Sequence, residues 1–275
     1  MAVEKMKPET GIKKAYKPLA LELPKADSVP EMDMTRYSYF VYGKQGIGKT
    51  TFTLQFPNTL HMMFEPGAKS EAIRKVEPKS WKEVEGYVSL IEKSSEYKVI
   101  AIDTVDLMWD MCAAQVCVDK GVDYLKDIGF GDGYDIAGTR FRNALIRIHN
   151  AKGLVMLSHS KGGGTNEKGE PEYIIPSAKK RCHETISKWA DITGYYYLNS
   201  QGKRMLRIRT NNICEAKCRP KIFFNYTDGV PVMDVPMGMS EEESYRNFEA
   251  GFNNQLVNPI KQKPQLKLKP KQFKI

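Results

Sequence analysis

The sequence predicts a three-layer α/β fold, in which helices cover both faces of a mainly parallel β-sheet. Segments typical of buried strands alternate with segments typical of helices along most of the chain, which is the order of a parallel sheet with crossover helices. A glycine-rich motif joins the first strand to the first helix. The 275 residues, 41% of them hydrophobic, suffice for one large α/β domain with extensions, or at most two small ones.

The glycine-rich motif reads GKQGIGKT and fits G-x-x-x-x-G-K-[ST], the phosphate-binding P-loop or Walker A motif. A predicted strand at 38–42 precedes it, and a predicted helix over 51–56 follows it. Glycines let backbone N–H groups curl around a phosphate, and the helix N-terminus adds its positive dipole end. We therefore expect ATP to bind here, held by Gly43, Lys44, Gln45, Gly46, Ile47, Gly48, Lys49, Thr50 and Thr51. Lys49 is expected to reach the β- and γ-phosphates, and the Thr50 hydroxyl to bind Mg²⁺.

The other elements follow in order. Further strands are predicted at 59–65, 97–103, 153–159, 191–198 and 204–210, from apolar runs or alternation. Helices are predicted at 81–91, 105–120, 139–151, 177–189 and 241–252. The segment 121–138, rich in glycine and aspartate, is predicted to be a loop too long for a plain connector.

The strand at 97–103 ends in an aspartate, which gives a Walker B pattern about fifty residues after the P-loop. Magnesium prefers hard oxygen ligands, and Asp103 can supply one beside Thr50, directly or through water. The alternative is an aspartate that caps the following helix. Asp106 is read either as such a cap or as a second acidic group.

The strand at 153–159 also ends in polar residues, Ser158 and His159. Polar side chains at the carboxyl edge of a parallel sheet face the ligand crevice, so either residue is a candidate sensor of the γ-phosphate. The alternative is a histidine that ends a strand beside a local backbone partner.

The next segment, 160–170, has too little apolar content to pack in a core. An exposed, flexible loop of this kind beside the nucleotide edge is a candidate for binding the backbone of single-stranded DNA. The residues concerned are Lys161, Gly162, Gly163, Gly164 and Lys168. A plain surface loop is the alternative.

Two cations, Lys217 and Arg219, lie two residues apart on a segment predicted to be extended, so their side chains point the same way. They are candidates for reaching the phosphate of a neighbouring subunit. A solvated basic turn explains the spacing equally well.

The net charge is +9, and residues 261–275 carry six lysines and no acidic residue. Such a tail suits a polyanion such as DNA or an acidic protein partner, and a disordered solubilising terminus is the alternative. No apolar run approaches the roughly 20 residues of a membrane span, and the first residues lack a signal-peptide core. We therefore expect a cytoplasmic protein without membrane contact. The five cysteines are read as reduced thiols, because their spacing matches no common zinc site.

From about residue 37 to residue 219 the chain resembles RecA-like ATPases of the short phage type, the core-only single-strand-annealing recombinases known as the Sak-four group. The resemblance is carried by the P-loop, Phe64-Glu65, Ile102-Asp103, Ser158-His159 with the glycine loop, Ala190-Asp191-Ile192, and Lys217-x-Arg219. It implies a RecA-like P-loop NTPase core of the ASCE type. It also implies that Glu65 polarises the attacking water and that Lys217 and Arg219 act in trans on the next subunit's nucleotide. The acidic residue usual before that glutamate is replaced by Phe64, and the basic tail is not part of the family core.

We expect an irregular lead-in at 1–35, an ATPase core at 36–226, a small helical appendage at 227–260 and a basic tail at 261–275. The expected function is that of an oligomeric, DNA-dependent ATPase in phage recombination, single-strand annealing or replication, working in the cytoplasm of the host. A single-strand-binding protein is a candidate partner of the tail. The alternatives are a hexameric helicase or translocase core, an ATP-switched DNA-binding module with little hydrolysis, and, less well supported, a small-molecule kinase.

Overall fold

The structure of the protein is a computed structural model that describes residues 22–164 and 173–256. The chain divides into two units, one that ends at Met32 and one that begins at Asp33. The described part of the first unit, residues 22–32, forms neither helix nor strand. Most of the expected lead-in and the whole basic tail lie outside the described residues.

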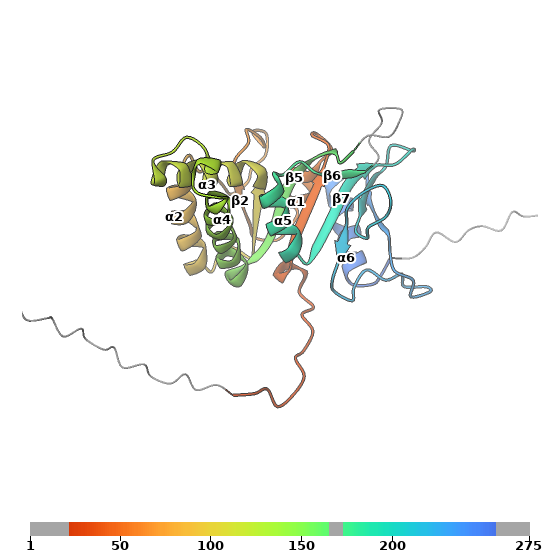
Figure 1. Cartoon of the computed structure of the whole chain (residues 1–275). Coiled ribbons are helices and arrows are strands. Elements are labelled where there is room, and N and C mark those ends of the chain that lie inside the picture. The colour runs from red at the N-terminus through yellow and green to blue at the C-terminus, as the bar shows by residue number, and fades with distance from the viewer. Residues whose placement is uncertain (1–21, 165–172, 257–275) are drawn as a thin grey trace, which may run out of the picture. The chain divides into compact units, whose positions relative to one another are not determined.

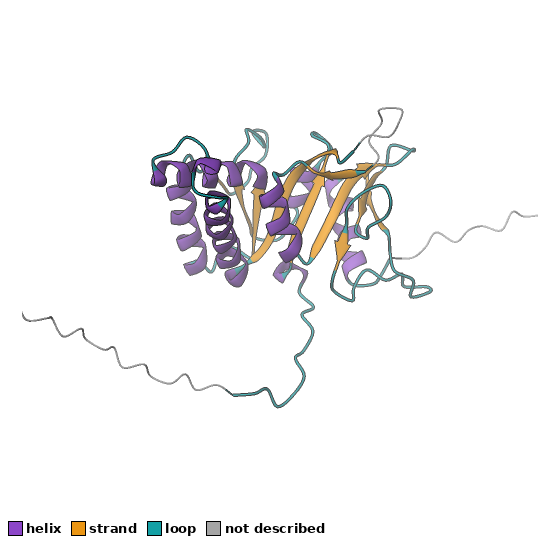
Figure 2. Ribbon diagram, viewed as in Figure 1, coloured by secondary structure: helices purple, strands orange, loops and turns teal. Residues whose placement is uncertain are grey.

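One β-sheet organises the second unit (Figure 2). Its strands lie in the order β10–β8–β7–β1–β5–β4–β2–β3, and two short strands, β6 and β9, pair with β5 and β7. The first six run over Ser38–Gly43 (β1), Thr59–Met63 (β2), Lys75–Val76 (β3), Val99–Asp103 (β4), Gly153–Gly162 (β5) and Ile174–Pro176 (β6). The last four run over Ile192–Leu198 (β7), Arg204–Arg207 (β8), Lys217–Cys218 (β9) and Asp234–Gly238 (β10). The pairs from β7 through β1 to β3 are parallel and only β8, β10 and the two short strands pair antiparallel, which confirms a mainly parallel sheet.

Helices cover both faces of the sheet, so the three-layer prediction is confirmed (Figure 1). On one face lie α2 (Trp81–Lys93), α3 (Val105–Lys120), α4 (Asp132–Ala151) and α5 (Lys180–Trp189). On the other face lie α1 (Lys49–Leu54) and α6 (Glu241–Phe252). Alternate strand residues divide between the layers: Phe40 packs with the first group and Tyr39 with the second. Strands β1, β2 and β4 are buried along their whole length, as apolar strands between two helical layers must be.

The strand order brings several chain segments to one edge of the sheet. β5 lies between β1 and β4, the additional-strand arrangement that the ASCE class is named after. Gly43 at the end of β1 is level with His159, and Asp103 at the end of β4 is level with Met63 at the end of β2. The P-loop, the Walker B aspartate and the segment that holds Glu65 therefore meet at the carboxyl edge.

The prediction of a loop over 121–138 is wrong for its second half, because α4 begins at Asp132. Gly131 precedes it with φ 105°, and two acidic residues, Asp132 and Asp135, occupy the first turn, where negative charge stabilises a helix. Gly133 serves close packing, since an added Cβ would lie 2.2 Å from the carbonyl oxygen of Leu125. Leu125 belongs to the short 3-10 turn η2 (Leu125–Asp127) and is buried.

The segment expected as a small appendage, 227–260, joins the main body as far as it is described. β10 pairs with β8, and the side chains of Phe248 and Phe252 on α6 are buried in the core beneath the sheet. Phe248 makes an edge-to-face contact with Phe52 of α1, with ring centroids 5.3 Å apart. α6 therefore shares one apolar layer with the helix that follows the P-loop.

We expect Phe248→Ala to lower the free energy of unfolding by about 3–5 kcal/mol, because it removes a fully buried ring from this layer. Urea denaturation followed by circular dichroism measures the loss. Tyr226→Ala is the control, since Tyr226 is 75% exposed and its removal is expected to change stability by less than about 0.5 kcal/mol. A similar small change for Phe248→Ala would contradict the shared core.

Candidate nucleotide site

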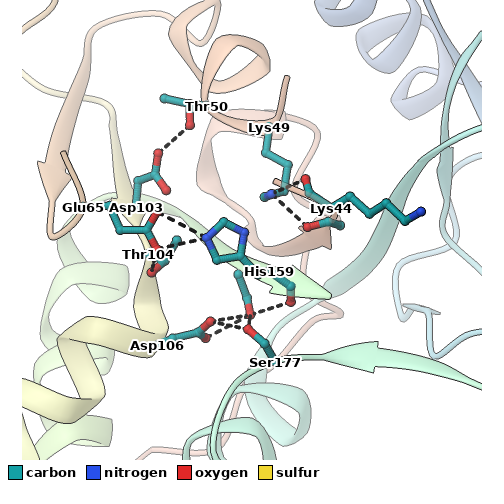
Figure 3. Close-up of polar contacts among 11 residues, drawn as sticks. Lys44, Lys49, Thr50, Glu65, Asp103, Thr104, Asp106, His159 and Ser177 are labelled. Atoms are coloured by element: carbon teal, nitrogen blue, oxygen red, sulfur yellow. Dashed lines mark hydrogen bonds and ion pairs between the residues drawn. The ribbon is translucent and has the colours of Figure 1, made fainter. Parts of the chain in front are cut away.

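The P-loop has the geometry of a phosphate cradle. Gly46 and Gly48 adopt positive φ angles of 72° and 100°, which side-chain-bearing residues rarely adopt, and α1 starts at Lys49 directly after them. The Lys49 amine lies inside the loop and donates hydrogen bonds of 2.9 Å to the carbonyl oxygens of Gly43 and Lys44 (Figure 3). The loop therefore surrounds one buried ammonium group. α1 is only six residues long, so a long helix dipole does not act here. The positive character of the P-loop comes from its local backbone N–H groups and from Lys49.

The Walker A threonine and the Walker B aspartate are in direct contact. The Thr50 hydroxyl donates a 2.5 Å hydrogen bond to the Asp103 carboxylate, although 53 residues separate them in sequence (Figure 3). A hydroxyl and a carboxylate side by side are hard oxygen donors of the kind that Mg²⁺ prefers. The residues present therefore fit a magnesium ion held beside the P-loop.

Burial shapes the electrostatics of this pair of charges. It lowers the pKa of the Lys49 amine, against the opposing charges of Asp103, Glu65 and Asp106. It raises the pKa of Asp103, although the hydrogen bond from Thr50 acts in the other direction. Both groups are poorly solvated, so a phosphate beside Lys49 or a divalent cation beside Asp103 would favour their charged forms.

Glu65 lies next to this pair and is held by two partners. The His159 Nε2 atom lies 3.0 Å from one oxygen of Glu65 and 3.2 Å from the other, and Thr104 donates a 3.0 Å hydrogen bond to the carboxylate. The backbone N–H groups of Phe64 and Glu65 both donate to the carbonyl oxygen of Asp103. The carboxylate predicted to polarise water, Glu65, and one predicted γ-phosphate sensor, His159, therefore form a single cluster beside Asp103 (Figure 3).

The prediction that Ser158 contacts the nucleotide is wrong. Its side chain is fully buried, and its hydroxyl donates to both oxygens of Asp106 at 2.9 Å. Ser177 adds a 2.7 Å hydrogen bond to the same carboxylate. Burial raises the pKa of Asp106, while these hydroxyls oppose the shift. Asp106 thus ties the start of α3 to β5 and to the segment before α5, a structural role that its position after Asp103 did not reveal.

Two cavities flank the P-loop. One, of about 230 Å³, is lined by Gly48, Thr51, Tyr196, Arg204 and Met239. The other, of about 290 Å³, is lined by P-loop residues Lys44, Gln45, Gly46 and Ile47 together with Tyr195 and Tyr197. Apart from Thr50, which contacts Asp103, the predicted P-loop ligands thus border the buried ammonium group or one of these cavities.

Arg204 was not anticipated as a site residue. It donates a 3.1 Å hydrogen bond to the carbonyl oxygen of Ile47 and a 2.7 Å bond to that of Met239, so it links the P-loop to β10. In the sequence it is one of several alternating cations in a hairpin strand, and nothing in that pattern distinguishes it.

Lys217 and Arg219 lie away from the P-loop of their own chain. β9 pairs with Ile192 and Thr193 at the start of β7, which is the amino edge of the sheet, whereas the P-loop follows the carboxyl end of β1. Lys217 donates to the carbonyl oxygen of Ser187, and Arg219 to those of Lys188 and Trp189. Both side chains do point the same way, but they meet the carbonyl groups at the C-terminus of α5.

The glycine loop lies at the tip of a β-hairpin. β5 continues past His159 to Gly162 and pairs antiparallel with β6. Lys161, Gly162, Gly163 and Gly164 are exposed, and the Lys161 amine donates to the carbonyl oxygen of Ser177 at 3.2 Å. Lys168 lies outside the described residues. The part that is described therefore starts at the nucleotide edge and projects beyond it.

Across the described residues, no helix has the length and apolar character needed to cross a bilayer. The strand order and the contacts of Lys49, Thr50 and Asp103 define a P-loop nucleotide-binding domain built on a mainly parallel sheet.

Residues 35–220, more than half of the chain, match the family described as "AAA domain", and the protein belongs to that family. Among solved structures, the chain is similar to the one described as "Crystal structure of the RadB recombinase", with 13% sequence identity and a TM-score of 0.39, covering 65% of this chain and 85% of that one. A search of curated proteins finds no match.

We expect the Lys217 amine to titrate near pH 8, because burial and the nearby Arg219 charge lower its pKa to about 8. In the unfolded chain the pKa of a lysine is about 10.4, so between about pH 8 and pH 10 the unfolded state holds this proton and the folded state does not. The free energy of unfolding therefore rises with pH over that range. NMR of the ¹³C-dimethylated protein measures the titration. Lys217→Met should remove both the resonance and the rise in stability, and a Lys217 resonance that titrates above pH 10 would contradict the burial of this amine.

Proposed function

We propose that this protein is an oligomeric, magnesium-dependent ATPase that single-stranded DNA stimulates, and that it anneals or pairs strands in phage recombination or replication. The observation that carries the ATPase part is the Thr50–Asp103 hydrogen bond at the rim of a P-loop that encloses Lys49. These groups come from α1 and β4, and only the strand order of the sheet brings them together. A structural turn has no need for a buried ammonium group beside a buried carboxylate.

The DNA part rests on the resemblance to the annealing recombinases and on the position of the glycine loop. The β5–β6 hairpin carries that loop beyond His159, the residue that contacts Glu65. Lys161 is exposed and follows His159 by two residues in the chain. A strand of DNA bound to Lys161 and the neighbouring glycines would therefore lie close to the nucleotide site. The basic tail at 261–275 is proposed to recruit DNA or a single-strand-binding protein, and it lies outside the described residues.

Bound magnesium–ATP supplies the phosphoanhydride bond and the divalent cation that neutralises charge on the phosphates. Lys49 would place its positive charge against the phosphates, and Thr50 and Asp103 would hold the metal. Glu65 is a fixed carboxylate beside them, suited to accept a hydrogen bond from a water molecule and to orient it for attack. The protein contributes mainly positioning and charge, which is what phosphoryl transfer requires.

A second candidate function is favoured by one observation. Two groups expected to act in hydrolysis have other partners in the structure: Glu65 contacts His159 and Thr104, and Arg219 donates to carbonyl groups of α5. A protein in which these contacts persist would bind ATP as a switch for DNA binding and hydrolyse it little. Normal annealing without turnover would identify that case, and directional unwinding of a forked duplex would instead identify a helicase.

We expect Lys49→Ala to reduce ATP turnover to background, because the loop loses the cation that faces the phosphates. The measurement is the ATPase rate with and without single-stranded DNA across a salt series, with Lys82→Ala on the exposed face of α2 as control. The wild type should be stimulated by DNA, and that stimulation should fall steeply between roughly 50 and 200 mM salt. Turnover that survives in Lys49→Ala would refute the assignment.

We expect Glu65→Gln to lower kcat by about 10²–10⁴-fold while ATP binding changes little, since the amide keeps the shape of the side chain but loses its charge. Steady-state kinetics and binding of a fluorescent ATP analogue separate the two quantities. His159→Gln is the companion variant, because it alters the partner of Glu65 and leaves the carboxylate in place. Equal kcat in Glu65→Gln and the wild type would exclude Glu65 as the residue that polarises the attacking water.

A further inference from the structure

Three tyrosine side chains stack in a row on one face of the sheet. Tyr42 of β1 and Tyr195 of β7 are paired in the parallel register, and their ring centroids are 5.2 Å apart. Tyr195 and Tyr197 are two residues apart on β7, so they share one face of the strand. Their ring centroids are 5.4 Å apart, with an interplanar angle of 7°. We call Tyr42, Tyr195 and Tyr197 the tyrosine ladder.

The ladder becomes more exposed towards the carboxyl edge of the sheet. Tyr42 is fully buried and Tyr195 is 8% exposed, whereas Tyr197 is half-buried. The Tyr197 hydroxyl donates a 2.9 Å hydrogen bond to Asp234, and the Arg207 guanidinium donates to the same carboxylate. The outermost ring is therefore held at its hydroxyl end and by the ring stacked beside it, so little ordering is left to occur when a ligand binds.

The cavity of about 290 Å³ beside the P-loop borders the outer end of the ladder. On the ladder side its lining residues are Tyr195, Tyr197 and Leu198, and on the P-loop side they are residues 44–47. Sites for small molecules usually measure about 300–1,000 Å³, so this cavity has room for a single flat ring system. A tyrosine ring presents the π-face on which such a ring stacks.

Strand β6 connects the ladder with the glycine loop. Ile174 of β6 packs in the same apolar cluster as Tyr42 and Tyr195, and it is paired with Gly162 of β5. The Tyr42 hydroxyl donates a 3.1 Å hydrogen bond to the carbonyl oxygen of Ile174. The loop that begins at Gly162 therefore starts next to the ladder, and one extended strand of nucleic acid can reach both.

The cations near the cavity are free to meet a polyanion. Lys44 and Lys161 are exposed, and neither forms an ion pair in the part of the chain that the structure describes. Figure 3 shows the Lys44 side chain pointing out of the P-loop. A positively charged surface beside a stack of aromatic rings is the combination by which proteins bind single-stranded nucleic acid.

Two acidic residues come close to the ladder, and both have partners. Asp234 pairs with Arg207 at 2.6 Å. Glu215, whose carbonyl oxygen accepts a hydrogen bond from Tyr42, contacts the His183 ring through its carboxylate at 3.0 Å. Because each carboxylate is already engaged, the exposed lysines determine the charge that a strand of DNA would meet here.

We propose that Tyr197 is a stacking platform for one unpaired base of single-stranded DNA, whose backbone runs over the glycine loop. The proposal rests on the DNA binding proposed above, and it adds the aromatic contact that the glycine loop itself lacks. The base of ATP is not the occupant. A nucleotide held by Lys49 and Thr50 would enter the other cavity, whose lining includes their neighbours Gly48 and Thr51.

The test is the binding of a fluorescently labelled oligothymidylate to the full chain, measured by anisotropy. Tyr197→Leu keeps an apolar side chain and removes the aromatic face, so it should raise the dissociation constant about fivefold or more. Tyr197→Phe keeps the ring and loses only the hydroxyl that contacts Asp234, so it should bind like the wild type. The matched control is Tyr226→Leu, the same substitution at a tyrosine that is 75% exposed and lies outside the ladder. It should also bind like the wild type.

Two further comparisons separate base stacking from phosphate contacts. Loss of a phosphate contact reduces counterion release, so Lys161→Gln should reduce the slope of log binding constant against log salt by about one. Tyr197→Leu should leave that slope unchanged and weaken binding at every salt concentration. An oligomer of abasic sites with the same number of phosphates should bind equally to the wild type and to Tyr197→Leu.

The outcomes are distinct. Equal binding of oligothymidylate by Tyr197→Leu and the wild type would overturn the proposal and leave the proposed function standing. An equal loss in Tyr197→Phe would assign the effect to the contact with Asp234, and an equal loss on the abasic oligomer would assign it to the backbone; either would overturn the proposal. Weaker binding of an ATP analogue by Tyr197→Leu without DNA would assign the cavity to the nucleotide instead. A wild type that hydrolyses ATP but binds no oligothymidylate would reject this inference and the DNA part of the proposed function together.

Discussion

The contact between the Thr50 hydroxyl and the Asp103 carboxylate is the constraint on which the rest of the site depends. The strands that carry the two motifs, β1 and β4, are not neighbours, because β5 lies between them and sets them about 10 Å apart. The contact forms because α1 turns back over the carboxyl edge and carries Thr50 towards β4. The same register places Gly43 level with His159 and Met63 level with Asp103, so Glu65 and His159 reach each other at that edge. Strand order, more than any single loop, assembles the site.

The sequence was sufficient where the signal was local. β1 and β4 were predicted because a parallel strand between two helical layers must be apolar throughout, and the residues after them fit motifs of fixed spacing. The sequence was insufficient where a glycine can either free the backbone in a loop or make room for a neighbour in a helix. The glycines at 131 and 133 indicated a loop, yet one starts α4 and the other lets Leu125 approach the helix. Composition cannot separate a glycine that frees the backbone from one that makes room for a neighbour.

Side-chain partners across long separations were beyond the sequence for a different reason. His159 and Glu65 are 94 residues apart, and Ser158 and Asp106 are 52 apart. The polar end of β5 did predict that functional groups gather there. Which of two adjacent residues faces the crevice depends on the alternation of the strand relative to the sheet, and that is fixed only when the register with β1 and β4 is known. Ser158 turns inward and His159 turns to Glu65 as a result.

Lys217 and Arg219 differ in how far they are buried, although both meet carbonyl groups at the end of α5. Both lie at the amino edge, where α5 ends and its last carbonyl groups carry partial negative charge. Lys217 is half-buried against these groups, and burial lowers its pKa to about 8 although its amine donates to the carbonyl oxygen of Ser187. Arg219 remains exposed, and its guanidinium donates to the carbonyl oxygens of Lys188 and Trp189.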